Sequence, residues 1–371
     1  MLDYPTLKLI WWGLVGILLI GFAIMDGHDL GIGTLLPFVG RDDRQRRIML
    51  TTVESHWEGN QVWLITGGGA IFAAWPLVYA TAFSGFYWAM LAVLWTLFLR
   101  PVGFHFRNKI HHPIWRQSWD WGLFVSGTVP TFIFGVAFGN LLQGVPFHFD
   151  DIMLVHYTGT FWELLNPFAL LCGVVSTAMI TLQGAVYLVH RTEADIQCRA
   201  RCAALFFGIL LLVCFSLAGI WLTVAIPGYV ITSPIDRSMV ANPLAKTVLQ
   251  EAGAWLTNYR VQPLTCLVPL LAYIGIGLSL LATWYRWTLS AFCASSLGIA
   301  GIIGTAGVAM FPFVMPSSSH FASSLTVWDS MSSPLTLSIM FWVALIFVPL
   351  IVFYTGWAYK VMAGKVTSAD H

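Results

Sequence analysis

Nine long apolar runs dominate this 371-residue chain, and each is long enough to form a membrane-spanning helix. About 20 apolar residues in a helix cross the hydrocarbon core of a bilayer. We therefore predict an all-α, multi-pass membrane protein that forms a single domain over residues 1–371. The predicted spans are 8–37, 49–72, 79–100, 119–141, 163–189, 203–226, 263–284, 288–312 and 335–360.

The composition agrees with lipid as the solvent for much of the surface. The chain is 58% hydrophobic and 9% charged, whereas soluble domains carry about 25% charged residues. A net charge of +1 gives no general basis for binding nucleic acid. The first run follows Asp3 rather than a basic patch, so we do not expect a cleaved secretory signal. We expect the six cysteines to be small buried or loop residues, without a metal or a disulfide.

The basic residues predict the orientation in the membrane. When successive connections are assigned to alternate sides, fourteen of the eighteen Lys and Arg residues fall on one side. The positive-inside rule places that side in the cytoplasm. The N-terminus is then periplasmic and the C-terminus cytoplasmic, as nine spans require. The outer loops are longer, and the loop 227–262 is predicted to hold a short helix around "NPLAKTVLQEAGAWL".

Four carboxylates, Asp26, Asp29, Glu54 and Glu58, fall within the first two predicted spans. Asp26 and Asp29, in "DGHDLGIG", are spaced i, i+3 and share one helix face. Asp29 precedes Arg41 by about 18 Å of helix, and Glu58 follows Arg47 by about 16 Å, at 1.5 Å per residue. We therefore expect Asp29 and Glu58 at similar depth on neighbouring helices. Charge inside a membrane is costly and often marks function.

More polar groups accompany these acids. The stretch "ESHWEGNQVWL" adds His56, Asn60 and Gln61, and "LFLRPVGFHFR" adds Arg100 and His105. Mixed donors and acceptors of this kind suit a proton path, and the candidates for it are Glu58, Asp26, Asp29, His105 and His56. Arg100 is expected to be a counter-charge. In the structural alternative, Arg100 and the acids only hold helices together.

A different class of function also stays open at this point. In a proton-coupled transporter the acids would be the coupling site, and inverted repeats with broken helices would accompany them. "DGHDLGIG" is one candidate break, but no counterpart occurs at the matching place in a second half of the chain. Neither a P-loop nor a dinucleotide-binding fingerprint is present.

Two histidines, His28 and His56, are the only ones predicted to lie well within spans. Because they sit among carboxylates on adjacent helices, we do not expect them to ligate a haem, and no metal site is predicted. Trp63 either lines an apolar route or only packs.

Several long motifs occur in order between residues 3 and 360. They are "DYPTLKLIWWGLVGILLIGFAIMDGHDLGIG", "HWEGNQVWLITGGGAIFAAWPLVYATAFSGFYWAM", "RPVGFHFR", "AFGNLLQGVPF", "NPFALLCGVVS" and "AMFPFVMPSSSHFASSLTVWDSMSSPLTL". In these motifs the chain resembles subunit II of the cytochrome bd quinol oxidases.

The resemblance implies a respiratory-chain complex in the bacterial cytoplasmic (inner) membrane. Such a complex oxidises quinol, reduces O2 to water and takes up protons from the cytoplasm. The partner, subunit I, would hold two haems b and one haem d, with none in this chain. The implied fold has two four-helix bundles plus one peripheral helix. A structural ubiquinone, whose site no motif here places, and a small single-span subunit are further implied components.

The resemblance also implies roles for individual residues. Glu58 stands at the acid of the "HW-acid-GNQ" motif on the family's proton route, and Asp26 and Asp29 are the acids of the "DGxDxG" motif. Trp63 resembles a residue that lines an O2 path in some members. His28 stands where members often carry Phe. His105 stands where close relatives carry Asp, which changes the local charge.

Overall fold

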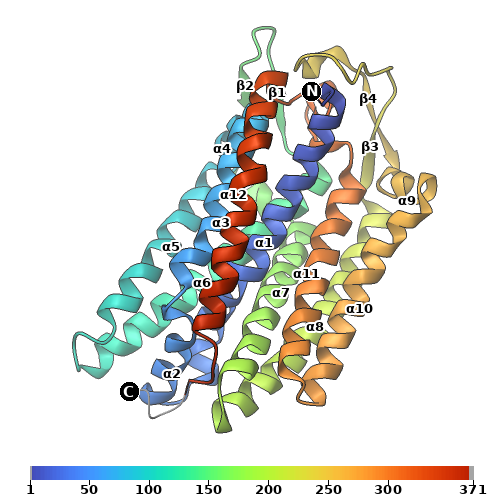
Figure 1. Ribbon diagram of the computed structural model, residues 1–371. Helices are drawn as coiled ribbons and strands as arrows, with labels where there is room; N and C mark the ends of the chain where they lie inside the picture. Colours follow the sequence, from blue (N-terminus) through green and yellow to red (C-terminus); the bar gives the residue numbers. More distant parts are fainter. Residues whose placement is uncertain (1, 367–371) are drawn as a thin grey trace.

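Long helices make up most of the protein, as the apolar runs predicted. The computed structural model describes residues 2–366, and its helices run along one common direction (Figure 1). The α-helices are α1 (Tyr4–Val39), α2 (Asp43–Glu54), α3 (Trp57–Ala74), α4 (Pro76–Gly85), α5 (Tyr87–Phe106), α6 (Pro113–Gln143), α7 (Pro167–Arg191), α8 (Ala194–Ala225), α9 (Thr257–Val261), α10 (Leu267–Trp284), α11 (Thr288–Met310) and α12 (Pro334–Val361).

The prediction of nine spans is close, with one region drawn differently. Within residues 2–366, eight helices are long and apolar enough to cross a membrane, or nine if α3 and α4 count as one bent span. The chain bends by 117° between these two helices, at Trp75 and Pro76. Pro76 disfavours helical geometry at the residue before it, so the chain turns there. The predicted third span, 79–100, was therefore placed too early: α5 begins at Tyr87.

The second predicted span is also interrupted. Residues 49–72 were expected to form one helix, but α2 ends at Glu54 and α3 begins at Trp57. His56 has φ −139° and ψ −1°, which lie outside the helical range. No proline marks this break in the sequence. Its consequence is that His56 is buried, whereas Ser55 before it is exposed.

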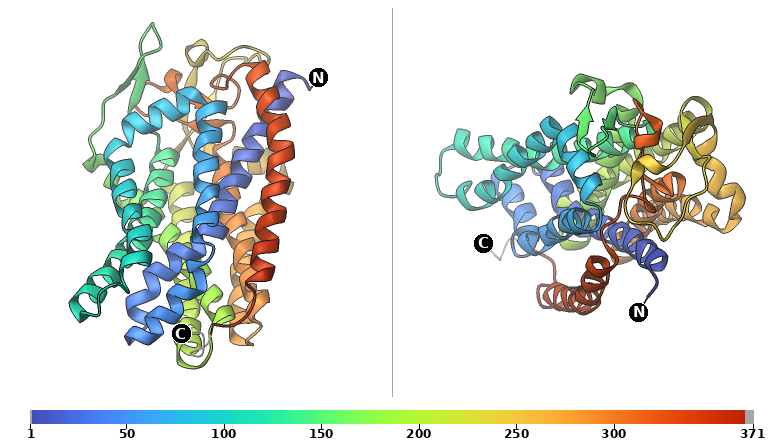
Figure 2. Two further views of the ribbon diagram at one scale, coloured as in Figure 1. Left: turned by 60° about the vertical axis from the view of Figure 1, so that its left-hand side comes forward. Right: turned by 90° about the horizontal axis from the view of Figure 1, so that it is seen from above.

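Helix α1 lies at the centre of the molecule and contacts α3, α6, α7 and α11. Helices α7, α8, α10 and α11 pack on one another, and α12 lies outside against α1 and α3 (Figures 1 and 2). Helix α1 starts and α12 ends at opposite ends of the molecule. Helix α1 is continuous through "DGHDLGIG", so the break considered there is wrong.

Two glycines on α1, Gly31 and Gly33, allow neighbouring backbones to approach closely. A Cβ on Gly31 would lie 2.3 Å from the carbonyl oxygen of Ile180 on α7, and one on Gly33 would lie 2.8 Å from that of Leu123 on α6. Small residues serve this purpose at helix contacts in membranes, where packing rather than hydrophobic burial drives association. The glycines therefore place α6 and α7 directly against the acidic stretch of α1.

Three two-stranded antiparallel sheets close the end of the bundle where α1 begins (Figure 1). They pair β1 (Phe147–Phe149) with β2 (Val155–Tyr157), β3 (Pro227–Ile231) with β4 (Val248–Ala252), and β5 (Phe313–Met315) with β6 (Leu325–Thr326). The helix predicted around "NPLAKTVLQEAGAWL" is thus wrong at its centre, which is strand β4. Short 3₁₀ turns flank it, η2 (Pro243–Ala245) and η3 (Ala254–Leu256); the other turns are η1 (Trp162–Leu165), η4 (Pro263–Cys266) and η5 (Phe321–Ser323).

Two buried lysines fasten this cap. The Nζ atom of Lys246 lies 2.7 Å from the carboxylate of Asp329. Burial lowers the pKa of Lys246, and the nearby Asp329 carboxylate opposes that shift. Lys8 donates to the carbonyl oxygens of Arg237 and Met239 at 3.1 and 2.9 Å, and also to that of Trp328. The three donors of its ammonium are thereby satisfied, and the loop segments are fixed to α1.

The cysteines differ in part from the prediction. All six are free, but Cys198, Cys202, Cys266 and Cys293 are exposed rather than buried. Cys198, Cys202 and Cys293 lie on long apolar helices, whose outward faces are expected to meet lipid.

We predict that Gly31→Ala lowers the thermal stability of the purified protein. The added methyl group would meet backbone atoms of α7, which cannot turn away as a side chain can, and overpacking of this kind costs about 1–3 kcal/mol. The melting temperature measures the effect.

Gly13→Ala on the same helix is the matched control, because nothing lies within 4 Å of its added Cβ. Equal melting temperatures for the two variants would contradict the close α1–α7 contact.

Candidate functional site

A buried ionic cluster joins α1 to α5. Arg100 contacts both carboxylate oxygens of Asp26, one of them at 3.2 Å, and its Nη2 lies 3.5 Å from Asp29 Oδ2. All three side chains are at most 4% exposed. As predicted, the i, i+3 spacing puts both acids on one face of α1, within reach of Arg100, which is the counter-charge that the sequence suggested.

Helix α3 extends this cluster through an amide. Asn60 donates from Nδ2 to Asp29 Oδ2 at 2.8 Å, and the same nitrogen lies 3.3 Å from His56 Nδ1. The other ring nitrogen of His56 lies 2.9 Å from the hydroxyl of Tyr187 on α7. The structure thus confirms that Asp29, His56 and Asn60 come together, and adds Tyr187.

Tyr359 on α12 covers the same group. Its hydroxyl donates to Asn60 Oδ1 at 2.9 Å and lies 3.3 Å from His28 Nε2. Its ring stacks on that of His56 at 4.6 Å between centroids. Sequence reasoning missed Tyr187 and Tyr359, because a tyrosine in an apolar run carries no charge to mark it and each lies far along the chain from α1.

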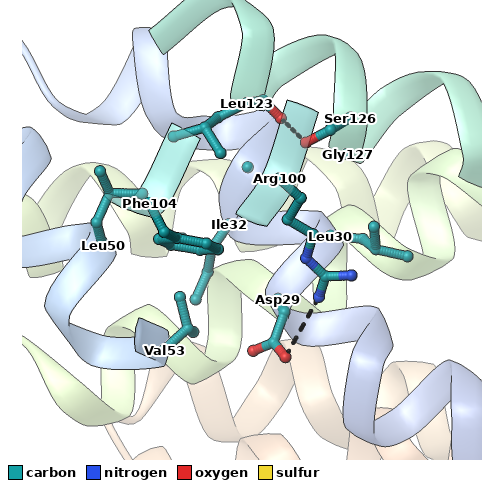
Figure 3. Close-up of a pocket in the computed structure, with 11 residues that line it drawn as sticks. Asp29, Leu30, Ile32, Leu50, Val53, Arg100, Phe104, Leu123, Ser126 and Gly127 are labelled. Carbon is teal, nitrogen blue, oxygen red and sulfur yellow. Dashed lines mark hydrogen bonds and ion pairs between the residues drawn. The ribbon is translucent and has the colours of Figure 1, made fainter. Parts of the chain in front are cut away.

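A small cavity touches the cluster on the side of α2, α5 and α6. Its volume is about 10 Å³, the scale of a single water molecule. Asp29 and Arg100 supply its charged lining, and Leu123, Phe104 and Val53 are among its apolar neighbours (Figure 3). The cavity offers room for one water beside the Asp29 carboxylate.

Other predicted residues lie outside the cluster. Glu58 and His105 are exposed, and the side chain of neither makes a hydrogen bond or ion pair with any residue in 2–366. Gln61 is half-buried. Because Asn60 touches Asp29 and lies two residues after Glu58, the similar depth expected for Asp29 and Glu58 is consistent with the structure. The expectation that His105 gathers with the acids is not met.

Trp63 is half-buried and packs on α1. A Cβ built on Gly21 would lie 2.4 Å from its ring, so the indole occupies the space that this glycine leaves. Its indole N–H has no acceptor among the described residues. Packing against α1 is therefore the contact that the structure shows for Trp63.

A second ionic network, which the sequence did not suggest, joins the start of α2, the end of α5 and the first part of α6. Arg107 contacts Asp120 at 2.5 Å and Asp43 at 2.9 Å, while Arg46 reaches Asp120 at 2.8 Å. Arg107 and Asp120 are almost completely buried. Asp120 lies inside the predicted span 119–141, and an acid at that position was the available signal.

The cluster is poorly suited to a haem. The adjoining cavity holds about one water, and the imidazoles of His28 and His56 pack against Tyr187 and Tyr359. Donor atoms of His28, Asp29 and His56 lie within 4.8 Å of one another. Such a spacing could hold a metal ion, although the guanidinium of Arg100 already supplies positive charge beside Asp29. The same donor and acceptor atoms could equally hold protons.

Comparisons with known proteins cover the whole chain. The family model for cytochrome bd terminal oxidase subunit II matches residues 7–362. Cytochrome bd-I ubiquinol oxidase subunit 2 of Escherichia coli K12 is 54% identical over 100% of this chain and 98% of its own length. Cytochrome bd ubiquinol oxidase subunit 2 of Bacillus subtilis is 31% identical, over 97% of each chain. The structure of bd oxidase from Geobacillus thermodenitrificans includes a chain with the same fold, at TM-score 0.69 and 13% identity, covering 96% of this chain and 98% of that one.

We predict that Arg100→Gln destabilises the protein by about 3–5 kcal/mol, because it leaves the buried Asp26 and Asp29 without their counter-charge. Chemical unfolding of the purified complex measures the loss. Arg116→Gln is the control, since its pair with Asp43 is partly exposed and such pairs contribute at most about 1 kcal/mol.

The double variant Asp26→Asn/Arg100→Gln should recover part of the loss, because one carboxylate is then removed together with the cation. Equal stability of Arg100→Gln and the wild type would show that the pair does not hold α1 and α5 together.

Proposed function

This chain belongs to the cytochrome bd terminal oxidase subunit II family and is thus a subunit of a membrane quinol oxidase complex, within which, we propose, it provides a proton-uptake route. One observation carries this proposal. A buried, hydrogen-bonded set of titratable groups surrounds Asp29 and includes Asn60 of α3. Two residues before Asn60, the same helix carries Glu58, an exposed carboxylate. Protons moving toward an O2-reducing centre need such groups within the membrane.

The route begins at Glu58 in this proposal. From there a proton reaches Asp29 by way of water, with Asn60 as the polar group that links α3 to that carboxylate at 2.8 Å. The cavity beside Asp29 and Arg100 gives a water molecule its place. His56 adjoins Asn60 and completes the buried group, while Asp26 and Arg100 form an ion pair beside Asp29. His105, exposed on α5, belongs to the cytoplasmic approach rather than to the buried part.

Glu58 also bears on the partner. An exposed carboxylate on a membrane helix needs either water or a protein neighbour, and no residue in 2–366 supplies one. We place the haem-bearing subunit I against the face of α3 that carries Glu58, where it gives that carboxylate a protein neighbour. Two haems b and one haem d then belong to subunit I, since the histidines of this chain fit a proton network better than a haem. The reaction is ubiquinol oxidation coupled to reduction of O2 to water.

The remaining features follow the sequence-based expectations. The N-terminus is periplasmic and the C-terminus cytoplasmic, by the distribution of basic residues. Helices α1, α3, α5 and α6 form one four-helix bundle, α7, α8, α10 and α11 the other, and α12 is peripheral. A structural ubiquinone, a small single-span subunit and an O2 path along Trp63 are further elements of this proposal.

A proton-coupled transporter is less well supported. That function calls for discontinuous helices whose ends point at the coupling site. Asp26 and Asp29 lie on α1, which is continuous from Tyr4 to Val39. Within residues 2–366, a helix break beside the acids occurs only before Glu58, at Ser55 and His56. The family model that matches is that of an oxidase subunit. A purely structural role for the acids is the outcome that the following test separates.

We predict that Glu58→Leu lowers quinol-oxidase turnover at least about tenfold, which corresponds to about 1.4 kcal/mol, with haem content intact. Leucine keeps the bulk of the side chain but cannot carry a proton. Turnover with a soluble quinol and the reduced haem spectrum are measured on the same preparation.

Glu54→Leu is the control, because Glu54 is likewise exposed and lies four residues earlier, at the end of α2. Glu58→Asp should retain activity. Wild-type turnover in Glu58→Leu would sink the proton route and leave the structural reading.

A further inference from the structure

The charges of the buried cluster do not balance if every group carries its usual charge. Asp26 and Asp29 offer two negative charges, and Arg100 is the one cation in contact with them among the described residues. An uncompensated carboxylate buried in a low-dielectric interior is strongly disfavoured. A proton within this group restores neutrality, so its location can be sought in the hydrogen bonds.

The backbone fixes the orientation of His28. Its Nδ1 lies 3.0 Å from the carbonyl oxygen of Ile24, one turn earlier on α1. A carbonyl oxygen only accepts, so Nδ1 carries a hydrogen, and in the neutral ring Nε2 is an acceptor. Nε2 lies 3.2 Å from Asp29 Oδ1. That oxygen is buried and has no hydrogen-bond donor among the described residues. Two acceptor atoms thus face each other at contact distance.

His56 can be set aside as the holder of this proton. Tyr359 donates to Asn60 Oδ1, so the amide nitrogen of Asn60 faces Asp29 and His56 Nδ1. That nitrogen is a donor, hence His56 Nδ1 accepts. His56 Nε2 then donates to the hydroxyl of Tyr187, and the ring is neutral with both nitrogens occupied.

We propose that His28 and Asp29 form a buried carboxyl–imidazole pair that holds one proton between Asp29 Oδ1 and His28 Nε2. This inference rests on the proposed proton route and adds His28 to it. When the proton moves from oxygen to nitrogen, the O–H bond breaks, an N–H bond forms, and the neutral pair becomes a carboxylate beside an imidazolium. Because Nδ1 stays bonded to Ile24, the proton enters and leaves at Nε2. His28 therefore stores a proton and does not conduct one through its ring.

Aromatic rings and a few charged groups surround the His28–Asp29 pair. The rings of Tyr187, Phe292 and Tyr359 enclose His28, the first at 4.2 Å between centroids, and His28 is 0% exposed. The titratable and charged groups facing the pair are Asp26 on α1, His56 next to α3, Arg100 on α5, Tyr187 and Arg191 on α7, and Tyr359 on α12. Each of these except Arg191 has a contact within the cluster that accounts for it.

The test uses the intact complex with His28→Phe and His28→Gln. Phenylalanine suits an aromatic enclosure, and glutamine keeps hydrogen bonding but cannot hold the proton. Infrared difference spectra should show either a protonated carboxyl band that is lost in Asp29→Asn or an imidazolium band that is lost in His28→Phe. The absence of both bands from the wild type overturns the proposal.

A second readout is the pH profile of turnover. Without His28 the proton is held less tightly, so the alkaline limb should move to lower pH by about one unit, a tenfold change in proton affinity, in both variants. Haem content and subunit co-purification show whether the complex is assembled.

The two proposals fail separately. If both His28 variants keep the wild-type profile while Glu58→Leu is impaired, the pair is wrong and the route stands. If Glu58→Leu turns over like the wild type, the route is wrong, and the infrared bands still decide whether the pair holds a proton.

Discussion

The contact of Arg100 with Asp26 and Asp29 is the interaction on which the inner part of this structure depends. Two carboxylates in the middle of a bundle are tolerated only where a cation and several hydrogen bonds compensate them. Arg100 supplies the cation from α5, and Asn60 supplies an amide from α3. Both must reach the same face of α1. The relative positions of α1, α3 and α5 are therefore constrained by charge as well as by packing.

Close packing on the opposite side of α1 makes this arrangement possible. Gly31 and Gly184 bring the backbones of α1 and α7 together, and Gly127 does the same for α6. Tyr187, one turn beyond Gly184 on α7, thereby comes within reach of His56. The polar group is thus enclosed by α1, α3, α5, α7, α11 and α12, and the small cavity beside Asp29 gives room for a water molecule. Because a net charge is costly in such an enclosed site, the group stays near neutrality, and the number of protons it holds is constrained.

The proposed division of labour within the oxidase follows from these physical limits. A subunit whose buried histidines are committed to Asp29, Asn60 and Tyr187 has little to offer a haem iron. What it can offer is a set of proton-holding groups at a fixed depth, and an exposed carboxylate, Glu58, toward a neighbour. His28 is the group that the proposed carboxyl–imidazole pair adds to that plan.

The sequence by itself determined the membrane character, the approximate spans and the family, and it singled out Asp26, Asp29 and Arg100 as charges within the membrane. Apolar length and intramembrane charge are local properties that can be read along one chain. The tertiary structure alone decided which side chains meet. Tyr359 lies 299 positions from Asn60 in the sequence. No proline marks the helix break at His56. Glu58 and His105 are exposed and lie apart from the buried acids. These outcomes depend on the rotation of each helix about its axis, which is fixed by packing against helices that are distant in sequence.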